Sequence, residues 1–210
     1  ETLTSNKKLP EEAYPTKLKN KKSKKLTIEF KNGEIDGLNG KKIDKIKAIE
    51  KISEICDSYC IGRDIHVGDT IIGIKGRVGF QAGGPQLIIK AHHLLEKHTL
   101  TKWQLFQKDR ISDFYGMLLH EGQYLDPVMR DIEAFLLSSQ SKVSGSVTST
   151  LYPYRFELDG IVSDNDLMNS DFGLYGEKNK LWDSNDAKGF IKILSSQNKI
   201  YQNVNEKNNN

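Results

Sequence analysis

Apolar and polar residues alternate in two parts of this chain, and the alternation predicts two antiparallel hairpins. In the first, residues 26–30 and 34–38 form strands joined at Asn32-Gly33, a pair that favours a tight turn. In the second, residues 143–152 and 155–162 form strands around Pro153-Tyr154. We therefore expect β-structure both early and late in the chain.

Helical spacing of apolar residues appears between and after these hairpins. Isoleucines recur at every third position from Ile43 to Ile55 with charges between them, which predicts a helix that buries one isoleucine stripe. A last helix, capped by Asp186, is expected to carry Phe190, Ile191, Ile193, Leu194 and Ile200 and to end in a polar tail at 202–210. Further helices are predicted at 86–97, 113–120 and 127–139, the last with Asp126 as N-cap and Pro127 at its first position.

Strands and helices are therefore mixed rather than strictly alternating, so we predict an α+β fold with a mixed sheet and packed helices. Residues 1–25 are rich in Pro, Asn and Lys and are expected to form an extended arm or linker before a domain at 26–185. Residues 165–182 are expected to form a long covering loop. A terminal amphipathic helix at 186–210 packs either on a partner subunit or back on its own domain.

Composition narrows the class of protein. The chain has 210 residues, 37% of them hydrophobic, and a mean hydropathy of −0.56, and no apolar run approaches the ~20 residues of a membrane span. Cys56 and Cys60 form neither a disulfide framework nor a metal knuckle, which predicts reduced thiols and a cytoplasmic location. The start at Glu1, without Met, indicates a piece of a longer protein.

A short run of lysines follows the expected arm. Such a run resembles an electrostatic footprint for nucleic acid, but no aromatic residues are interleaved for base stacking. We therefore expect a solvated, mobile linker rather than a nucleic-acid partner. The lysines are Lys17, Lys19, Lys21, Lys22, Lys24 and Lys25.

The densest set of polar groups lies between residues 60 and 100. Residues 71–74 are apolar and read as a strand, Lys75 and Arg77 follow it, and glycines then lead into the helix that begins at Gln86. Cations beside free helix-start amides favour a carboxylate-bearing or other anionic ligand. Residue types alone favour a simpler interpretation, a surface hairpin leading into a core helix. The nearby His92, His93 and His98 are interpreted as polar edge residues, and no metal site is predicted.

From about residue 26 onward the chain carries a series of short motifs. They include Gly62-Arg63, Ile72-Gly73-Ile74-Lys75-Gly76-Arg77 and, before a helix, Gly83-Gly84. Their order resembles the C-terminal half of argininosuccinate synthase, whose pattern begins with G-x-G-R, continues with I-G-x-K-x-R, and then has a glycine-rich turn and a helix. The resemblance continues through Ala91-His92, Leu100-Thr101, Phe114-Tyr115-Gly116-Met117-Leu118, Gly122-Gln123-Tyr124, Asp126-Pro127-Val128-Met129-Arg130 and Asp186-Ala187-Lys188-Gly189-Phe190-Ile191-Lys192-Ile193.

This resemblance implies a ligase that joins citrulline and aspartate with cleavage of ATP to AMP and pyrophosphate. The family's S-G-G-x-D-x-S loop, which binds ATP, does not occur in these 210 residues. ATP and Mg²⁺ are therefore expected to bind mainly to an N-terminal half, and no catalytic residue is assigned in this chain, which would be inactive alone. The resemblance also implies a synthetase domain at 26–185 and a homotetramer with an exchanged C-terminal helix, which favours the partner subunit for that helix.

The chain departs from the family at two positions that bind citrulline. A Glu and a Tyr of better-known members fall, without gaps, on Gly68 and Phe80. Either Asp69, His66 or Arg63 rebuilds the site, or the substrate is an N-acyl citrulline without the ammonium that a Glu would meet. Lys75 and Arg77 either face substrate carboxylates or form salt bridges at the strand edge. The predicted substrate-binding set is thus Arg63, His66, Gly68, Asp69, Lys75, Arg77 and Phe80.

Two rival functions remain at this stage. The same fold could serve as a non-catalytic oligomerisation module, or the lysine run could bind nucleic acid. An upstream ATP loop in the complete gene would favour the ligase. Steeply salt-dependent binding to RNA or DNA would favour the nucleic-acid-binding function.

Overall fold

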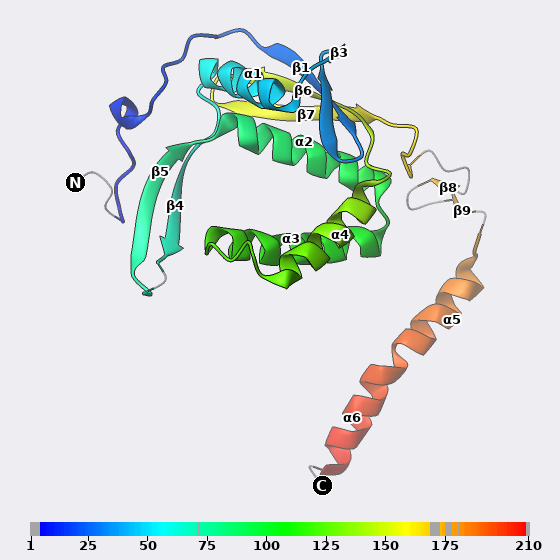
Figure 1. Cartoon of the computed structure of the whole chain (residues 1–210). Helices are drawn as coiled ribbons and strands as arrows, with labels where there is room; N and C mark the ends of the chain where they lie inside the picture. Colours follow the sequence, from blue (N-terminus) through cyan, green and yellow to red (C-terminus); the bar gives the residue numbers. More distant parts are fainter. Residues whose placement is uncertain (1–4, 71, 169–172, 175–177, 180, 209–210) are drawn as a thin grey trace. The chain divides into compact units, whose positions relative to one another are not determined.

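The computed structural model describes residues 5–70, 72–168, 173–174, 178–179 and 181–208. The chain divides into two units, Glu1–Leu167 and Met168–Asn210, and each is described by itself. The first unit contains a five-stranded sheet, two helices packed on it, a separate two-stranded hairpin and a pair of further helices (Figure 1). The α+β fold predicted from the sequence is confirmed.

The main sheet is antiparallel throughout and has the order β3-β2-β1-β6-β7. Both predicted hairpins join in it, because β1 pairs with β6. Asn32 and Gly33 have φ values of 51° and 80°, as a tight turn between β1 and β2 requires. The strands are β1 (Lys24–Lys31), β2 (Glu34–Leu38), β3 (Lys41–Lys42), β6 (Gly145–Tyr152) and β7 (Arg155–Val162).

The main hydrophobic core lies between one face of this sheet and the helices α1 (Lys45–Ser58) and α2 (Gly83–Thr99). Alternate residues of β1, namely Leu26, Ile28 and Phe30, are buried there, while the residues between them point to the other face. Because α2 lies at the centre of the core, its first turn is held in place. The hairpin that precedes α2 in the sequence extends from this turn.

The buried stripe of α1 differs from the predicted one. Ile46 and Ile49 are 68% and 44% exposed, whereas Ala48, Ile52 and Cys56 are fully buried. A step of three residues turns a helix through about 300°, so the isoleucines wind around it, whereas a spacing of four stays closer to one face. The residues that face the core are therefore those spaced by four, and they include Ala and Cys as well as Ile.

Two further helices, α3 (Lys102–His120) and α4 (Pro127–Gln140), pack against each other. The helix α3 begins eleven residues before the predicted start at 113, because Thr101 and Gln104 form a capping box at its first turn. Asp126 accepts a hydrogen bond from the Val128 amide, which confirms the predicted N-cap of α4.

A two-stranded hairpin, β4 (Arg63–Asp69) and β5 (Lys75–Gln81), separates α1 from α2 and stands apart from the main sheet (Figure 1). The strand predicted at 71–74 is wrong for its described residues, since Ile72 and Ile74 are 79% and 61% exposed at the hairpin tip, and Ile71 lies outside the described residues. The Gly73 amide donates to the Thr70 carbonyl and the Thr70 amide to the Ile74 carbonyl, which closes a turn. This turn geometry overrides the β-propensity of the isoleucines.

The second unit contains β8 (Gly173–Leu174), β9 (Lys178–Asn179), α5 (Ser184–Leu194) and α6 (Ser196–Asn208). The predicted cap at Asp186 is wrong, because Asp183 is the N-cap and Asp186 completes a capping box from the third helical position. The predicted polar tail is helical as far as Asn208. The expected covering loop at 165–182 includes positions 169–172, 175–177 and 180, which lie outside the described residues. None of the described helices is long and apolar enough to cross a membrane.

Candidate functional site

The register of the β4–β5 hairpin divides the predicted site residues between two faces. Residues directly opposite each other in an antiparallel pair share a face, and neighbours along a strand alternate. One face, here the anchored face, carries Arg63, Asp69, Lys75 and Arg77, whereas the other, the open face, carries His66, Gly68 and Phe80. The register therefore divides the seven predicted residues between the two faces of the hairpin.

Arg63 holds the base of the hairpin. Its side chain is only 9% exposed. The guanidinium donates to Gln81 Oε1 at 3.1 Å and to Cys60 Sγ at 3.2 Å, and it also donates to the Thr16 carbonyl and the Glu11 carboxylate. These partners occupy the donors that a substrate carboxylate would need, so the structure gives Arg63 an anchoring position.

The aromatic contacts of Arg63 add to this anchor. Its guanidinium carbon lies 4.5 Å from the Tyr14 ring centroid and 5.7 Å from that of Tyr154. Burial would lower the pKa of Arg63, but the hydrogen bond to Glu11 and the nearby Cys60 outweigh it, so the pKa lies above its usual value. The group is permanently charged and brings together the arm, the end of α1, the hairpin and the β6–β7 turn.

The N-terminal arm is attached to the first unit by further hydrogen bonds. The amides of Lys19 and Asn20 both donate to the Ser58 carbonyl at 3.0 Å, and Thr16 Oγ1 donates to Gln81 Oε1 at 2.9 Å. Lys24 and Lys25 lie in β1. The expected mobile linker is therefore corrected for this part of the lysine run, because backbone bonds to α1 and to β6 hold it.

The remaining cations of the anchored face have different surroundings. Lys75 Nζ lies 2.6 Å from Asp69 Oδ1, and both side chains are largely exposed. Asp69 thus has a cationic partner on the face opposite to Gly68. Arg77 Nη1 is buried without a hydrogen-bond partner among the described residues. Of the two interpretations of these cations, the strand-edge salt bridge is the one seen at Lys75.

On the open face, His66 takes the place of a side chain at Gly68. A Cβ built on Gly68 would lie 2.6 Å from His66 Nε2, so the imidazole occupies the volume that any larger residue at position 68 would enter. Phe80 is half-buried on the same face, four residues along β5 from Gly76, which pairs with Gly68. Four residues of strand span about 13 Å, enough for a small extended amino acid between the two positions.

The glycines of the family motif have a local structural cause. Gly62 has φ of 81°, and a Cβ there would lie 2.3 Å from the Gly83 amide nitrogen. The Ala82 amide donates to the Gly62 carbonyl at 2.9 Å. Only glycine permits the base of the hairpin to approach the first turn of α2 so closely.

A second polar cluster lies between α2 and α3, beside a cleft of about 520 Å³. Glu96 is fully buried, and Lys108 Nζ lies 2.5 Å from its Oε2, while Gln140 Nε2 donates to its Oε1 at 2.8 Å. Ligand atoms of His93, Glu96 and Asp109 lie within 4.8 Å of one another, which is a spacing that a metal ion could use. The ammonium of Lys108 already contacts both carboxylates, so it supplies the positive charge there.

This cluster perturbs two ionisable groups. Burial alone would raise the pKa of Glu96, but the hydrogen bond and charge of Lys108, together with His92, hold it below its usual value. Burial lowers the pKa of His92, and the opposing effect of Glu96 does not compensate. A neutral His92, whose Nε2 lies 3.0 Å from Gln140 Oε1, therefore sits beside a charged Glu96–Lys108 pair.

Comparisons with known proteins agree with the motif order. The sequence matches the family described as the Arginosuccinate synthase C-terminal domain over residues 4–201. This chain belongs to that family. The membership covers the arm, the hairpin, both helix pairs and most of the second unit, so it does not rest on one short motif.

Curated argininosuccinate synthases resemble this chain along most of its length. That of Xanthomonas campestris pv. campestris is 36% identical over 196 residues, which are 93% of this chain and 48% of the relative. That of Xanthomonas axonopodis pv. citri is 37% identical over 180 residues, with 86% and 43% covered. That of Dictyoglomus turgidum is 34% identical over 193 residues, with 91% and 48% covered. The chain spans about half the length of the curated relatives it matches.

Sequence reasoning missed the residues that hold the hairpin in place. Tyr14, Thr16 and Gln81 carry no motif, and two of them lie almost fifty residues from Arg63 in the sequence. A polar residue at the end of a strand can be recognised as the partner of a buried arginine only when the bounds of that strand are known. The predicted set therefore mixes anchoring residues with residues of the open face.

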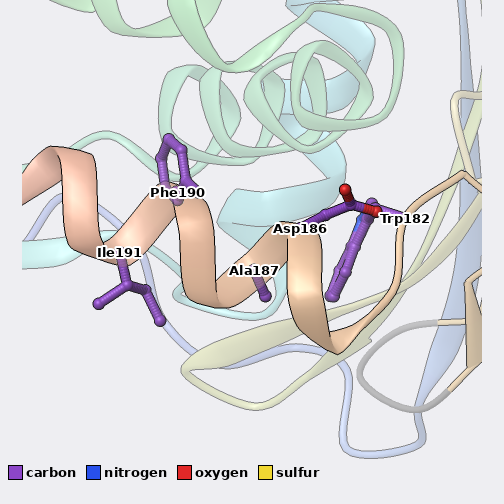
Figure 2. A pocket seen from close by; sticks show the side chains of 5 residues that line it. All are labelled: Trp182, Asp186, Ala187, Phe190 and Ile191. Atoms are coloured by element: carbon purple, nitrogen blue, oxygen red, sulfur yellow. The ribbon is translucent and has the colours of Figure 1, made fainter.

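An apolar pocket of about 390 Å³ lies within the second unit. Figure 2 shows its lining, in which Trp182 precedes α5 and lies beside the first turn of that helix. Ala187, Phe190 and Ile191 complete the apolar lining, and Asp186 is the acidic member. Phe190 and Ile191 are each 64% exposed, so this helix presents much apolar surface.

Proposed function

We propose that this chain is the C-terminal part of an argininosuccinate synthase, a ligase that joins citrulline to aspartate at the expense of ATP. The observation that carries the proposal is the family match from residue 4 to residue 201, with the hairpin motif in an intact, anchored β4–β5 pair. The chain spans about half of its relatives, so the proposed activity belongs to the longer protein.

In the proposed reaction the ureido oxygen of citrulline attacks the α-phosphorus of ATP, and pyrophosphate leaves. The aspartate amine then attacks the resulting citrullyl-adenylate, and AMP leaves. ATP and Mg²⁺ bind mainly to the N-terminal half, where the metal ion neutralises charge on the departing pyrophosphate. The work of this chain is to position citrulline, because correct placement lowers the barrier without any covalent role for the protein.

The open face of the hairpin is the proposed contact with citrulline. Gly68 and Phe80 occupy the positions that the family resemblance implies, and the register places both on this face together with His66. Arg63 and Asp69 lie on the anchored face, and Asp69 already pairs with Lys75. Among the three residues considered as a replacement for the missing carboxylate, His66 is thus the one that shares the open face.

A second substrate is favoured by the same local geometry. The imidazole of His66 occupies the volume that a side chain at position 68 would enter. In this proposal that side chain is the Glu that would meet the α-nitrogen of citrulline. An imidazole can form a hydrogen bond but offers no negative charge to an ammonium in either protonation state. An N-acyl citrulline has an uncharged amide at its α-nitrogen. It would therefore bind better beside His66 than beside a Glu at position 68.

The second unit supports a homotetramer. Its two helices have apolar side chains at 53% to 76% exposure, and no residue of α5 is buried. Two short helices without a buried face are unstable in isolation, and a neighbouring subunit is the proposed cover. These side chains are Phe190, Ile191, Ile193, Leu194, Ile200, Tyr201 and Val204. The proposed location of the assembled enzyme is the cytoplasm, because Cys56 and Cys60 are both free.

Complementation of a bacterial strain that lacks argininosuccinate synthase tests the proposal. The full-length gene should restore growth without arginine. Failure to restore growth, from a protein that is expressed and folded, would favour the alternative function, a non-catalytic oligomerisation module of the same fold. Growth only when an N-acyl citrulline is supplied, together with a deacylase that removes the acyl group after ligation, would favour the N-acyl substrate.

A further inference from the structure

The polar cluster around Glu96 brings three groups that can ligate a metal ion to the cleft between α2 and α3. His93 and Glu96 are three residues apart on α2, a spacing that puts both side chains on the same face of the helix. Asp109 comes from α3, which begins at Lys102, soon after α2 ends at Thr99. One imidazole and two carboxylates from two helices thus meet at one place.

The distances between these ligand atoms are close to those of a tetrahedral metal site. Nitrogen and oxygen ligands lie about 2.0–2.2 Å from Zn²⁺, so two ligands of a tetrahedral ion are about 3.3–3.6 Å apart. His93 Nδ1 lies 3.3 Å from Glu96 Oε2 and 3.9 Å from Asp109 Oδ1. The Asp109 side chain is 46% exposed, so a rotation can bring its carboxylate the remaining distance.

Glu96 is oriented toward this position by a second hydrogen bond. Its side chain is fully buried, and its Oε1 accepts a hydrogen bond from Gln140 Nε2 at 2.8 Å. The other oxygen, Oε2, is the one that faces Lys108 and His93. Hydrogen bonds of this kind fix the orientation of metal-ligating carboxylates. A carboxylate that is buried and already oriented loses little conformational entropy when it binds a cation.

Lys108 holds the position that a metal ion would take. Its Nζ lies 2.5 Å from Glu96 Oε2 and 3.3 Å from Asp109 Oδ1. When His93 is neutral, as a ligand must be, this one ammonium balances only one of the two carboxylates. A divalent cation would neutralise both, whereas an amine ligand would exchange one positive charge for another. Lys108 lines the cleft, and its flexible stem allows the ammonium to turn away.

We propose that His93, Glu96 and Asp109 bind a divalent transition-metal ion, with Zn²⁺ as the representative, which displaces the ammonium of Lys108. A mixed set of nitrogen and oxygen ligands suits Zn²⁺, whereas Mg²⁺ and Ca²⁺ prefer oxygen ligands. Three protein ligands leave a fourth position for water from the cleft. Bound metal would join α3 to α2, so its expected effect is on stability. The proposal stands independently of the ligase reaction, because none of its residues belongs to the β4–β5 hairpin.

Calorimetric titration of the full-length protein with Zn²⁺, in the absence of ATP and Mg²⁺, tests the site. His93→Gln should weaken the binding of Zn²⁺ by about tenfold or more, because an amide is a much poorer ligand than an imidazole. The matched control is His120→Gln, which replaces an exposed histidine at the end of α3, outside the lining of the cleft. This control should bind Zn²⁺ as the parent does. Equal affinities of the parent and His93→Gln would overturn the proposal.

Lys108→Met distinguishes the proposed site from chance binding elsewhere. Met keeps much of the aliphatic stem and removes the competing ammonium, so Zn²⁺ should bind about tenfold more tightly. The melting temperature of this variant should also rise more on addition of Zn²⁺ than that of the parent. Unchanged or weaker binding would show that Lys108 does not compete, and would overturn the proposal. If the variant is unfolded without metal because Glu96 has lost its partner, Zn²⁺ should restore the fold, and failure to do so would contradict the proposal.

Discussion

The Arg63 guanidinium stacks 4.5 Å from the centre of the Tyr14 ring and thereby joins the base of the β4–β5 hairpin to the N-terminal arm. A residue that sequence analysis assigned to substrate binding thus has a mechanical task in this structure. Among the residues that the structure describes, the hairpin makes no pairing with the main sheet, so its direction depends on contacts at its base. Arg63 donates four of the hydrogen bonds there, and Thr16 and Gln81 make further ones.

Replacing Arg63 should loosen this base. Arg63→Ala is expected to lower the free energy of unfolding by about 2–4 kcal/mol, through loss of buried charged hydrogen bonds and stacking rather than of the exposed Glu11 ion pair. Arg63→Lys keeps the charge but loses the forked geometry and should cost about 1–2 kcal/mol. Urea titrations measure both. Equal stability of all three proteins would show that the anchor has no energetic role.

Two glycines with the same backbone angle give a matched pair. Gly62 and Gly73 have φ of 81° and 79°, but only at Gly62 would a Cβ meet backbone, at 2.3 Å from the Gly83 nitrogen. Gly73→Ala should cost about 1 kcal/mol from the left-handed conformation, and Gly62→Ala about 2–4 kcal/mol because the helix start must move. Thermal melts compare them. A larger loss at Gly73 would contradict the described approach.

His92 should make stability depend on pH. Its folded pKa lies below the value of about 6.5 in unfolded chains, so the unfolded state binds more protons below that pH. The free energy of unfolding should therefore fall as the pH drops below about 6.5. His92→Gln should flatten this part of the curve. Denaturant titrations from pH 7.5 to 5 measure the slope, and identical slopes in the variant and the parent would exclude His92 as its source.

A carboxylate at position 68 should change substrate preference. Gly68→Glu displaces the His66 ring, which is exposed and can rotate away, so the fold should be retained. We expect the KM for citrulline to fall and that for an N-acyl citrulline to rise, because the new charge attracts an ammonium and not an amide. The control, Val67→Glu, adds the same charge on the anchored face and should alter neither KM. Equal effects of the two variants would indicate general electrostatics rather than a contact.

Local signals predicted much of the fold, and long-range contacts account for most of what they missed. The Asn32-Gly33 turn and the Asp126 cap depend on neighbouring residues, so the sequence alone located them. Apart from Cys60, the partners of Arg63 lie 18 to 91 residues away, and no local pattern indicates them. Their identification requires the folded chain.

The candidate site was predicted by residue type but not by face. Placing a strand at 71–74 left the register of the hairpin undefined, and a shift of one residue moves every side chain to the other face. The observed turn after Thr70 settles the register and separates Asp69 from Gly68. The family motifs located the correct segment because they do not depend on that register.

Pyrophosphate release by the full-length protein, with ATP, aspartate and either citrulline or an N-acyl citrulline, tests the central claim most directly. The account predicts release that requires both aspartate and a citrulline substrate, with a preference for the acylated form if the open face acts as described. Turnover with citrulline but not with the N-acyl citrulline would support the ligase function and contradict the preference for the acylated substrate. No release with either substrate, from a folded protein that binds ATP, would contradict the account and leave the oligomerisation module as the function.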